Sequence, residues 1–528
     1  MARWFALVFV VSACGDTASQ QLEEVTAAPQ EQTAGHASGS WRPVASPPIA
    51  AAGLPLLLTD GTVMVQESGT PTWWRLTPDR EGSYAQGTWS ELAPMPTDYS
   101  PLYMASAVLP DGRVIIEGGE YLSGDSAFTT RGAIYDPVAN AWTEVAPPPG
   151  WRTIGDASGM VLANGRFLLS SCCDGPPGPT ALLDASSLTW TPTGGGKIDL
   201  HDEESWVMLW DDRILTIDCN NLADVTLAEA YDPATGMWSA IGHTPIQISD
   251  TSEDADSSHE IGPHVLQNDG TVLAIGANGH NVTYDPSTDA WRTVPDLPVV
   301  AEGQLDSADG PAATLPNGHV LIAASPGVFG YPTHMLDWDG AQFTEVAAPP
   351  NAEVDSSFQQ TMLVLPTGEL LLTDGSNDVE LYTPAPGYPD TAVPVITDLF
   401  MPMTSARLRA PSDVHAPATA EALLTPVADL YRGQTYKLAV QRMNGVTQGA
   451  YYGDDSQSFT NYPIARLTYA SSGRVVYGRT YQHSNRAIGP DKHGTTLLDV
   501  PLAADQGLAS LQVIANGIPS PSVLVNIK

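Results

Sequence analysis

A tryptophan-centred phrase, Trp-x-x-Val-x-x-x-Pro with variations, recurs through the chain and limits its fold more than any other feature. Successive copies are separated by 48, 53, 48, 48, 53 and 52 residues. A period near fifty residues with a turn signal in every unit predicts a repeat architecture built of small sheets. The seven copies are centred on Trp41, Trp89, Trp142, Trp190, Trp238, Trp291 and Phe343.

Each repeat has the pattern of four short strands. An apolar run ends in a turn dipeptide such as Asp111-Gly112, which supplies the positive backbone angles of a two-residue hairpin. A second strand follows, and a third ends in Tyr-Asp-Pro, as at 135–137, with its Tyr seven residues before the Trp. Seven units of four strands predict a seven-bladed β-propeller over 41–384. The first Trp phrase has no repeat before it, so we expect the strand at 41–47 to complete the last blade and close the ring.

The periodicity ends after Pro384, where a Pro-rich joint begins. Residues 385–528 then alternate in short apolar strands, including TYKLAVQRM and RVVYGRTY, without an apolar stripe of helical length. This pattern is typical of a β-sandwich. The chain is therefore predicted to be all-β, with a propeller followed by a sandwich.

The N-terminal residues MARWFALVFVVSAC combine one Arg, an apolar run too short to span a bilayer, and a sequence like a bacterial lipobox. They predict a lipoprotein signal peptide over 1–14, with lipid attached to Cys14. An ordinary signal peptide is the alternative. Residues 15–40 are polar and predict a flexible tether. We expect an exported lipoprotein at the outer membrane, the cell surface or in the periplasm, in contact with the membrane only through its anchor.

The charge of the chain argues against negatively charged partners such as nucleic acids and anionic lipid surfaces. The sequence has 22 basic and 60 acidic residues, a net charge of −38. Nucleic acids and anionic lipid surfaces require clustered Lys and Arg, so neither is an expected partner. The same charge favours cations as ligands.

Three cysteines remain after Cys14, so at least one is unpaired within the chain. Facing sheets lie about 10 Å apart, whereas a disulfide needs Cα atoms within about 7 Å. A direct bridge between Cys172 and Cys219, which share a register in adjacent repeats, is therefore disfavoured. A Cys173–Cys219 bridge and a vicinal Cys172–Cys173 bridge both stay open, and plain packing is preferred to a redox role.

A propeller behind an export signal, followed by a sandwich ending in GIPSPSVLVNI, resembles the galactose oxidase architecture over 41–528. That family joins a kelch-type propeller to an immunoglobulin-like (early-set) domain. The resemblance implies copper held by a Tyr-His pair on the last blade, a His on a sandwich hairpin, and a second Tyr crosslinked to Cys. Here Phe358 and Gln359 stand at the Tyr-His pair and Gln457 at the hairpin His. Because Cu(II) prefers nitrogen and anionic oxygen donors, we expect the scaffold without the copper site.

The register of the missing His can be read in every repeat. Four consecutive repeats place a carboxylate there, so we predict that these four meet at one mouth of the central channel. Converging carboxylates repel unless a cation or good hydrogen bonds compensate, which favours a hard cation, Ca²⁺, or a cationic or hydroxyl-rich ligand. The alternative is that each accepts backbone N–H groups of its neighbouring blade. The register contains Ala52, Tyr103, Asp156, Glu203, Glu260, Asp309 and Gln359.

Two functional interpretations follow. The preferred one is a binding module that holds an extracellular glycan or protein ligand at the mouth, with the four carboxylates as Ca²⁺ ligands and no catalytic residue assigned. Its predicted ligand-binding residues are Tyr103, His201, His259, Gln359 and Gln457. The alternative is a copper-radical oxidoreductase with a displaced ligand set of His201, His259 and Tyr103. A purely structural surface protein is a third interpretation. A hydrolase is disfavoured because the sequence lacks a nucleophile-elbow motif.

Overall fold

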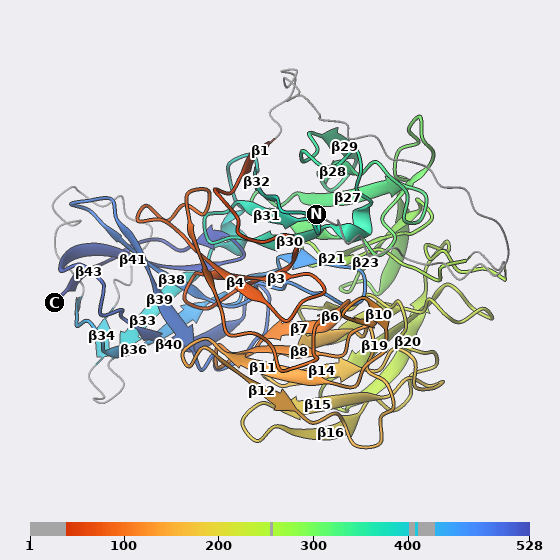
Figure 1. Ribbon diagram of the computed structural model, residues 1–528, viewed down its shortest axis with the longest axis horizontal. Helices are drawn as coiled ribbons and strands as arrows, with labels where there is room; N and C mark the ends of the chain where they lie inside the picture. The colour runs from red at the N-terminus through yellow and green to blue at the C-terminus, as the bar shows by residue number, and fades with distance from the viewer. Residues whose placement is uncertain (1–38, 254–256, 401–406, 410–427) are drawn as a thin grey trace.

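The computed structural model describes residues 39–253, 257–400, 407–409 and 428–528 (Figure 1). The predicted signal peptide, Cys14 and nearly all of the predicted tether lie outside the described residues. Within the described part, the helical turns are two 3-10 helices, η1 (Ser357–Gln359) and η2 (Asp390–Ala392). None of the described helices is long and apolar enough to cross a bilayer.

The described residues contain seven antiparallel sheets of the propeller type, each with four blade strands. The first strands of most neighbouring sheets pack against one another, and that of the last sheet packs against that of the first. Blades one to four consist of β2 (Ala52–Leu57), β3 (Val63–Glu67), β4 (Trp73–Thr77) and β5 (Thr88–Glu91); β7 (Ala105–Val108), β8 (Val114–Glu117), β11 (Gly132–Asp136) and β12 (Ala141–Val145); β13 (Gly159–Val161), β14 (Phe167–Ser170), β15 (Thr180–Asp184) and β16 (Thr189–Thr193); β17 (Val207–Met208), β18 (Ile214–Ile217), β19 (Leu227–Asp232) and β20 (Met237–His243).

The last three blades follow the same order and differ only in their additions. Blade six gains two short strands, and a separate small sheet lies beside blade two. Blades five to seven consist of β21 (His264–Leu266), β22 (Val272–Ile275), β23 (Asn281–Asp285) and β24 (Ala290–Val294); β26 (Ala312–Thr314), β27 (Val320–Pro326), β28 (His334–Trp338) and β29 (Phe343–Val346); β30 (Thr361–Val364), β31 (Leu370–Thr373), β32 (Val379–Thr383) and β1 (Ser40–Pro43). The additional strands are β25 (Leu305–Asp306), β37 (Ala450–Tyr451), β6 (Pro101–Leu102), β9 (Tyr121–Leu122) and β10 (Asp125–Ser126).

The first described strand closes the ring. β1 pairs antiparallel with β32, and Trp41 lies opposite Tyr382. Figure 1 shows β1 beside β32 at one edge of the propeller. The last blade therefore takes its outer strand from the beginning of the propeller segment, which covers a sheet edge that would otherwise be open.

The recurring Trp joins each blade to the one before it. On β12, the Trp142 ring packs 5.1 Å from the Tyr135 ring of β11, and its indole N–H donates to the Ala93 carbonyl of the previous repeat at 2.9 Å. An indole suits this position because its ring covers apolar surface while its N–H reaches a partner. The same Trp–Tyr packing recurs at Trp41, Trp238 and Trp291.

The turn dipeptides lie in hairpins, but the predicted two-residue loops are wrong. In blade one the Leu58 N–H donates to the Thr62 carbonyl, which leaves three residues in the loop. Only the last of them, Gly61, has a positive φ, 78°, as in a type I turn followed by a left-handed residue. The Asp60 carboxylate accepts the Thr62 N–H at 3.0 Å and fixes the turn. The dipeptide therefore signalled the hairpin correctly but not its loop length.

The C-terminal strands form a sandwich in two hydrogen-bonded layers that share β39. One half of β39 pairs with β38, and the other half pairs with β40. Leu438 and Leu498 of one layer pack in the same core as Leu467 and Leu511 of the other. The strands are β33 (Val395–Phe400), β34 (Arg407–Arg409), β35 (Ala428–Leu430), β36 (Thr435–Gln441), β38 (Ile464–Tyr469), β39 (Val475–Tyr481), β40 (His493–Asp499), β41 (Gly507–Ala515), β42 (Ile518–Pro519) and β43 (Val523–Ile527).

A hairpin of the sandwich domain, residues 447–461, enters the propeller channel. β37 of this hairpin pairs with β26, the Met208 N–H donates to the Gln448 side-chain oxygen at 2.8 Å, and the Ser458 hydroxyl donates to the Met362 carbonyl. The blade turns face the sandwich, as the close approach of Gly61 to Tyr477 shows. The hairpin tip therefore reaches the mouth at the far end of the channel.

Candidate functional site

Eight carboxyl groups gather where the hairpin tip meets the inner strands. Four are the predicted residues, each just before the first strand of its blade. Two more flank them in the propeller, and two come from the hairpin tip. We call this set the mouth cluster: Asp156, Glu203, Glu260, Asp309, Glu120, Asp202, Asp454 and Asp455.

The chain turns sharply at the mouth in five consecutive blades. Tyr103, Glu203, His259 and Asp309 have φ values of 51°, 59°, 65° and 46°, and Gly155 has 69°. For a residue other than glycine this left-handed conformation is uncommon and costs free energy, and such residues gather at functional sites. The repeated conformation shows that the mouth positions are equivalent, with a one-residue offset in the third and fifth blades.

Several carboxylate oxygens of the cluster are buried without a hydrogen-bond partner. They are Oδ1 of Asp156, Oδ2 of Asp454 and Oδ1 of Asp455, on residues that are 7%, 2% and 1% exposed. Oδ1 of Asp309 also lacks a partner. At Asp156 and Asp309, hydrogen bonds to the neighbouring blade therefore leave at least one carboxylate oxygen without a partner. A buried charge without a partner is costly, so these oxygens favour a compensating cation.

Burial and mutual repulsion raise the pKa values of the cluster. Burial, opposed by a hydrogen bond from Glu203 and reinforced by Asp202, raises the pKa of Glu260 to about 8. Burial chiefly raises the pKa of Asp455 to about 7, and that of Asp156 well above its usual value with added repulsion from Asp202. The charges that act most on Asp156 are other carboxylates rather than Lys or Arg. In the absence of a cation, these shifts therefore favour protonated carboxyl groups at the mouth.

Tyrosines surround the carboxylates. The Tyr452 hydroxyl donates to the Phe358 carbonyl at 2.5 Å and lies 3.4 Å from Oδ2 of Asp309. The Tyr103 ring lies edge-on to Tyr121, with centroids 6.0 Å apart. Burial and the charge of Asp309 raise the pKa of Tyr103, so its phenol stays protonated at neutral pH. The predicted Tyr103 therefore does lie with the cluster.

The structure does not bring His201 to the cluster. Its ring is fully buried between Trp206 and Trp238, with centroids 5.4 and 5.3 Å away. Register fixes where its backbone lies, but the side chain turns into the blade. Because His201 is apart from Tyr103, the displaced copper set of His201, His259 and Tyr103 does not assemble. His259 adjoins Glu260, and its Nδ1 is buried without a partner.

The two predicted glutamines serve the local backbone. The Gln457 side chain accepts the Tyr452 N–H and donates to the Tyr452 carbonyl, both at 3.1 Å, which holds the hairpin tip in shape. The Gln359 side chain accepts the Ser356 N–H at 2.9 Å at the start of η1. Their amides are therefore occupied, and Phe358 supplies no phenolate. These residues do not fit a copper site.

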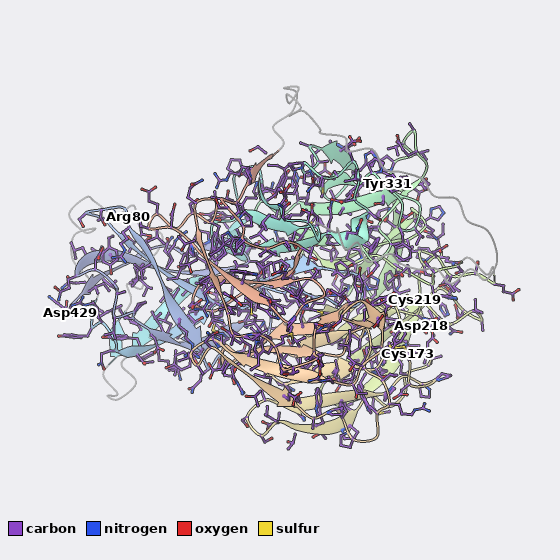
Figure 2. All side chains as sticks on the ribbon, viewed as in Figure 1. Arg80, Cys173, Asp218, Cys219, Tyr331 and Asp429 are labelled. Carbon is purple, nitrogen blue, oxygen red and sulfur yellow. A yellow bond between two sulfur atoms is a disulfide. The ribbon has the colours of Figure 1, made fainter. Side chains whose placement is uncertain are left out.

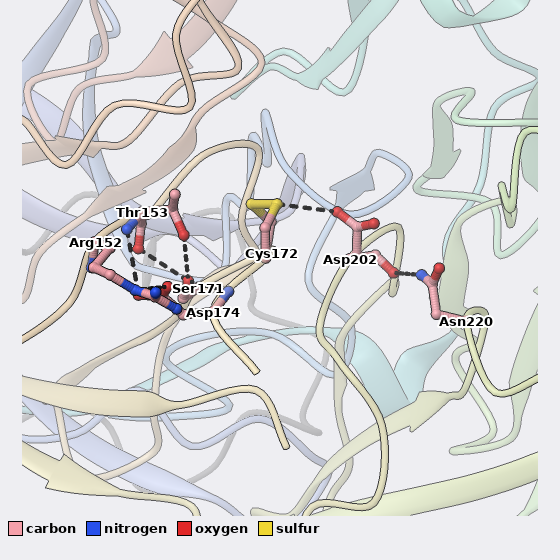
Figure 3. The surroundings of a disulfide bond; sticks show 8 residues. Arg152, Thr153, Ser171, Cys172, Asp174, Asp202 and Asn220 are labelled. Atoms are coloured by element: carbon pink, nitrogen blue, oxygen red, sulfur yellow. Dashed lines mark hydrogen bonds and ion pairs between the residues drawn. A yellow bond between two sulfur atoms is a disulfide. The ribbon is translucent and has the colours of Figure 1, made fainter. Parts of the chain in front are cut away.

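A vicinal disulfide joins Cys172 to Cys173 at the edge of the mouth, and Cys219 is a free, buried thiol. Of the two pairings left open by the sequence, this is the one present. Sγ of Cys173 lies 3.5 Å from Oδ1 of Asp202. Figure 3 shows the disulfide joined to Asp202 by a dashed line. Both sulfurs and oxygens of Asp156 and Asp202 lie within 4.8 Å of one another. Because a thiolate is the sulfur form that binds metals, the oxidised pair leaves the mouth with oxygen donors.

Reduction should distinguish these cysteines. After native reduction with a dithiol, iodoacetamide is expected to modify Cys173, which is exposed, before Cys219. Cys219 is fully buried, and burial together with nearby carboxylates raises the pKa of its thiol. Peptide mass spectrometry over time gives both rates, with a denatured sample as the control in which both react. Equal rates in the native protein would contradict the described burial. Figure 2 labels Cys173 at the end of the molecule away from Asp429 of the sandwich.

Two residues of the cluster, Asp454 and Asp455, give little signal in the sequence. They follow Gly453, and an acidic pair after a glycine is more typical of a turn than of a cation site. The Ser158 hydroxyl donates to the Asp454 carbonyl at 3.0 Å, across 296 residues, which places the tip in the mouth. The one local signal was an acidic pair in the loop that aligns with the hairpin of the galactose oxidase family.

The fold and the site define a kelch-type propeller with a galactose-oxidase-like C-terminal domain, as the sequence predicted. The architecture is similar to that of a fungal alcohol oxidase described as a novel member of the AA5 family, in complex with copper. That comparison has a TM-score of 0.50 and 14% identity, and covers 93% of this chain and all of the other. At this identity the likeness shows the fold alone.

Comparisons by sequence are narrower. The Kelch-like protein terF of Aspergillus terreus is 33% identical over 84 residues. The match covers 16% of this chain and 18% of that protein, so it spans less than a fifth of either. No family model matches the chain.

Proposed function

We propose that the protein is an exported binding module that takes a divalent cation, Ca²⁺, at the mouth cluster and uses it to hold an extracellular glycan or protein ligand. The observation that carries this proposal is the set of buried carboxylate oxygens of Asp156, Asp454 and Asp455 that have no partner. Attachment to the membrane through Cys14 belongs to the same proposal and rests on the N-terminal sequence.

The chemistry of the donors favours Ca²⁺ over other metals. Ca²⁺ takes six to eight oxygen ligands in flexible geometry, whereas Mg²⁺ demands a tight octahedron and Cu(II) prefers nitrogen. The mouth offers carboxylates from several blades and from the hairpin. It lacks the Tyr-His pair and the hairpin His that copper would use in this architecture, so we derive no oxidase chemistry for it.

The ligand would approach from the open side of the mouth. Glu203 and Asp309 are half-buried, in contrast to Asp454 and Asp455 deeper in the channel. Tyr103 and Tyr121 are also half-buried and offer rings with polar edges, which suits a hydroxyl-rich or peptide ligand. A cation bound by the deeper carboxylates would keep free coordination positions on the open side of the mouth, where oxygens of the ligand could bind.

Calcium binding at the mouth can be tested by equilibrium dialysis. The double variant Glu260→Gln, Asp309→Asn is expected to lose one bound Ca²⁺ relative to the unmodified protein, because it removes two charges without changing side-chain shape. Glu91→Gln, an exposed carboxylate on β5, is the matched control and should lose none. An unchanged Ca²⁺ count in the double variant would contradict the proposal.

The same variants test the ligand. On an array of glycans and on extracellular protein extracts, binding should need Ca²⁺ and should fall at least about tenfold in the double variant, which corresponds to about 1.4 kcal/mol. Equal binding in chelator and in Ca²⁺ would contradict the proposed role of the mouth cluster.

A further inference from the structure

A second group of oxygen-bearing side chains lies in the hairpin between β31 and β32, away from the mouth cluster. The sequence Asp-Gly-Ser-Asn-Asp-Val-Glu at 374–380 places an oxygen-bearing side chain at every other position. The Ser376 N–H donates to the Asp374 carboxylate at 2.9 Å, and the Asp378 N–H donates to the Ser376 hydroxyl at 3.0 Å. The loop therefore turns its side-chain oxygens toward one point.

Asn351, from the preceding blade connection, occupies that point. Its side-chain nitrogen lies 3.1 Å from Oδ2 of Asp374, 3.2 Å from the Ser376 hydroxyl and 3.1 Å from Oδ2 of Asp378. Three acceptors surround a group with two N–H bonds. An amide can be reversed with almost no change in shape, which would present its oxygen. The NH₂ group thus stands where oxygens converge as they would around a cation.

Two further carboxylates point to a ligand independently of this loop. Oδ2 of Asp355 and Oε2 of Glu380 have no hydrogen-bond partner, and these residues are 6% and 2% exposed. Both lie close enough to Asp374 and Asp378 to be repelled by them. Burial, reinforced by Asp374, raises the pKa of Asp355 to about 8 and that of Glu380 to about 9. Two buried acids, each with one oxygen that lacks a partner, thus lie beside two more acids, and a cation bound among them would stabilise their ionised forms.

We propose that this group is a second cation site, which we call the loop site, and that it takes Ca²⁺. Carboxylate, hydroxyl and amide oxygens are the donors that this ion prefers, and three of them already surround the Asn351 nitrogen. Aspartates alternating with another oxygen donor in one loop also resemble the ligand spacing of known Ca²⁺ loops. The loop site consists of Asn351, Asp355, Asp374, Ser376, Asp378 and Glu380.

The loop site lies where the last blade contacts the first, so an ion bound there would stabilise the closure of the ring. The Gly375 N–H donates to the Ala52 carbonyl at 2.8 Å, and the Ala52 N–H donates to the Ser376 carbonyl. The same hairpin holds β1, because the Val44 N–H donates to the Val379 carbonyl at 2.8 Å. A cation that orders residues 374–378 would thus fasten the last blade to the first. The ring is closed here by hydrogen bonds and packing rather than by a continuous chain.

The test uses the mouth double variant Glu260→Gln, Asp309→Asn as its background, so that the loop site is measured alone. In equilibrium dialysis this background should bind one Ca²⁺, and adding Asp374→Asn with Glu380→Gln should abolish it. At a hundredfold excess of Ca²⁺ over its Kd, the melting temperature of the background should rise by about 3–4 °C. That rise should disappear in the quadruple variant.

Two controls separate ion binding from folding. Removing repelling charges should leave the melting temperature in chelator equal to that of the background or higher, whereas a purely structural role would lower it. Glu369→Gln breaks the Arg42 ion pair at the opposite end of the same blade. Whatever its effect on stability in chelator, this variant must keep the rise with Ca²⁺. A background that binds no Ca²⁺, or a quadruple variant that still binds one, would overturn the loop site. Neither outcome tests the mouth cluster. The Ca²⁺ bound there is tested separately, by comparing the background with the unmodified protein.

Discussion

Replacing Lys197 with methionine is expected to lower the free energy of unfolding of the propeller by about 3–5 kcal/mol. Its ammonium group donates to Glu204 at 2.8 Å, to Asp218 at 3.0 Å and to Glu229 at 2.7 Å. All four side chains are fully buried. Without Lys197, the three buried carboxyl groups have no positively charged partner. Keeping them in the folded state, ionised or protonated, then costs more free energy.

Lys197, Glu204, Asp218 and Glu229, which we call the Lys197 group, join the connection between blades three and four to the strands of blade four. Lys197 lies between blades three and four, while Asp218 follows β18 and Glu229 lies on β19. Burial raises the pKa of Glu204 to about 8 and that of Asp218 to about 9, although Lys197 opposes both shifts. Without Lys197, these acids should be fully protonated in the folded state at neutral pH.

Denaturant unfolding followed by tryptophan fluorescence measures the effect of Lys197→Met. Lys437→Met, an exposed lysine on β36, is the matched control and should change stability by less than about 0.5 kcal/mol. Adding Glu204→Gln, Asp218→Asn and Glu229→Gln to Lys197→Met should restore part of the loss, because neutral amides need no counter-ion. If Lys197→Met unfolds at the same denaturant concentration as the control, the buried group contributes nothing.

The blades were predictable because their signals are local. Trp142 packs on Tyr135, only seven residues earlier, and Gly61 ends a turn that its own neighbours define. Each such contact is repeated at nearly constant spacing, so one sequence pattern determines sheet after sheet. The four predicted carboxylates converge for the same reason, since equivalent residues of a closed ring face one axis.

The remaining parts of the site depend on contacts that no local pattern encodes. The Ser106 hydroxyl donates to the Gln457 carbonyl across 351 residues, and such contacts bring Asp454 to the mouth. Lys197 finds its partners on later strands, and the direction of His201 is set by Trp206 and Trp238. Register gave the backbone position of His201 but not its side-chain rotamer, which packing decides.

Without Ca²⁺, the protein should become less stable as the pH rises from about 5 to 8. Burial, with repulsion among the carboxylates, raises the pKa values of Glu260 to about 8 and of Asp455 and Glu120 to about 7. Between about pH 4.5 and 8 the folded protein therefore binds more protons than the unfolded chain, whose acids ionise near pH 4. Stability present at low pH is lost as the pH rises through these folded-state values.

One buried histidine opposes this trend only in part. Burial lowers the pKa of His264 to about 3, so the unfolded chain gains a proton near pH 6.5 that the folded protein does not bind. Because three carboxyl groups outweigh this histidine, stability without metal should still fall as the pH rises from about 5. Because each pKa unit corresponds to about 1.4 kcal/mol per group, a few groups should lower the melting temperature by at least about 5 °C from pH 6.5 to 8.

Saturating Ca²⁺ should reduce this decline, since a bound cation keeps the mouth carboxylates ionised and makes protons compete with metal. The share that comes from Glu204 and Asp218, which lie beside Lys197, should stay. Melting temperatures at half-unit pH steps, in chelator and in Ca²⁺, measure both curves. Glu260→Gln should weaken the decline in chelator, whereas the exposed control Glu91→Gln should leave it intact. Parallel curves with and without Ca²⁺ would mean that the buried acids are compensated within the protein itself. The unpartnered oxygens of Asp156, Asp454 and Asp455 argue against that compensation, because nothing in the folded chain beside them replaces the water they have lost.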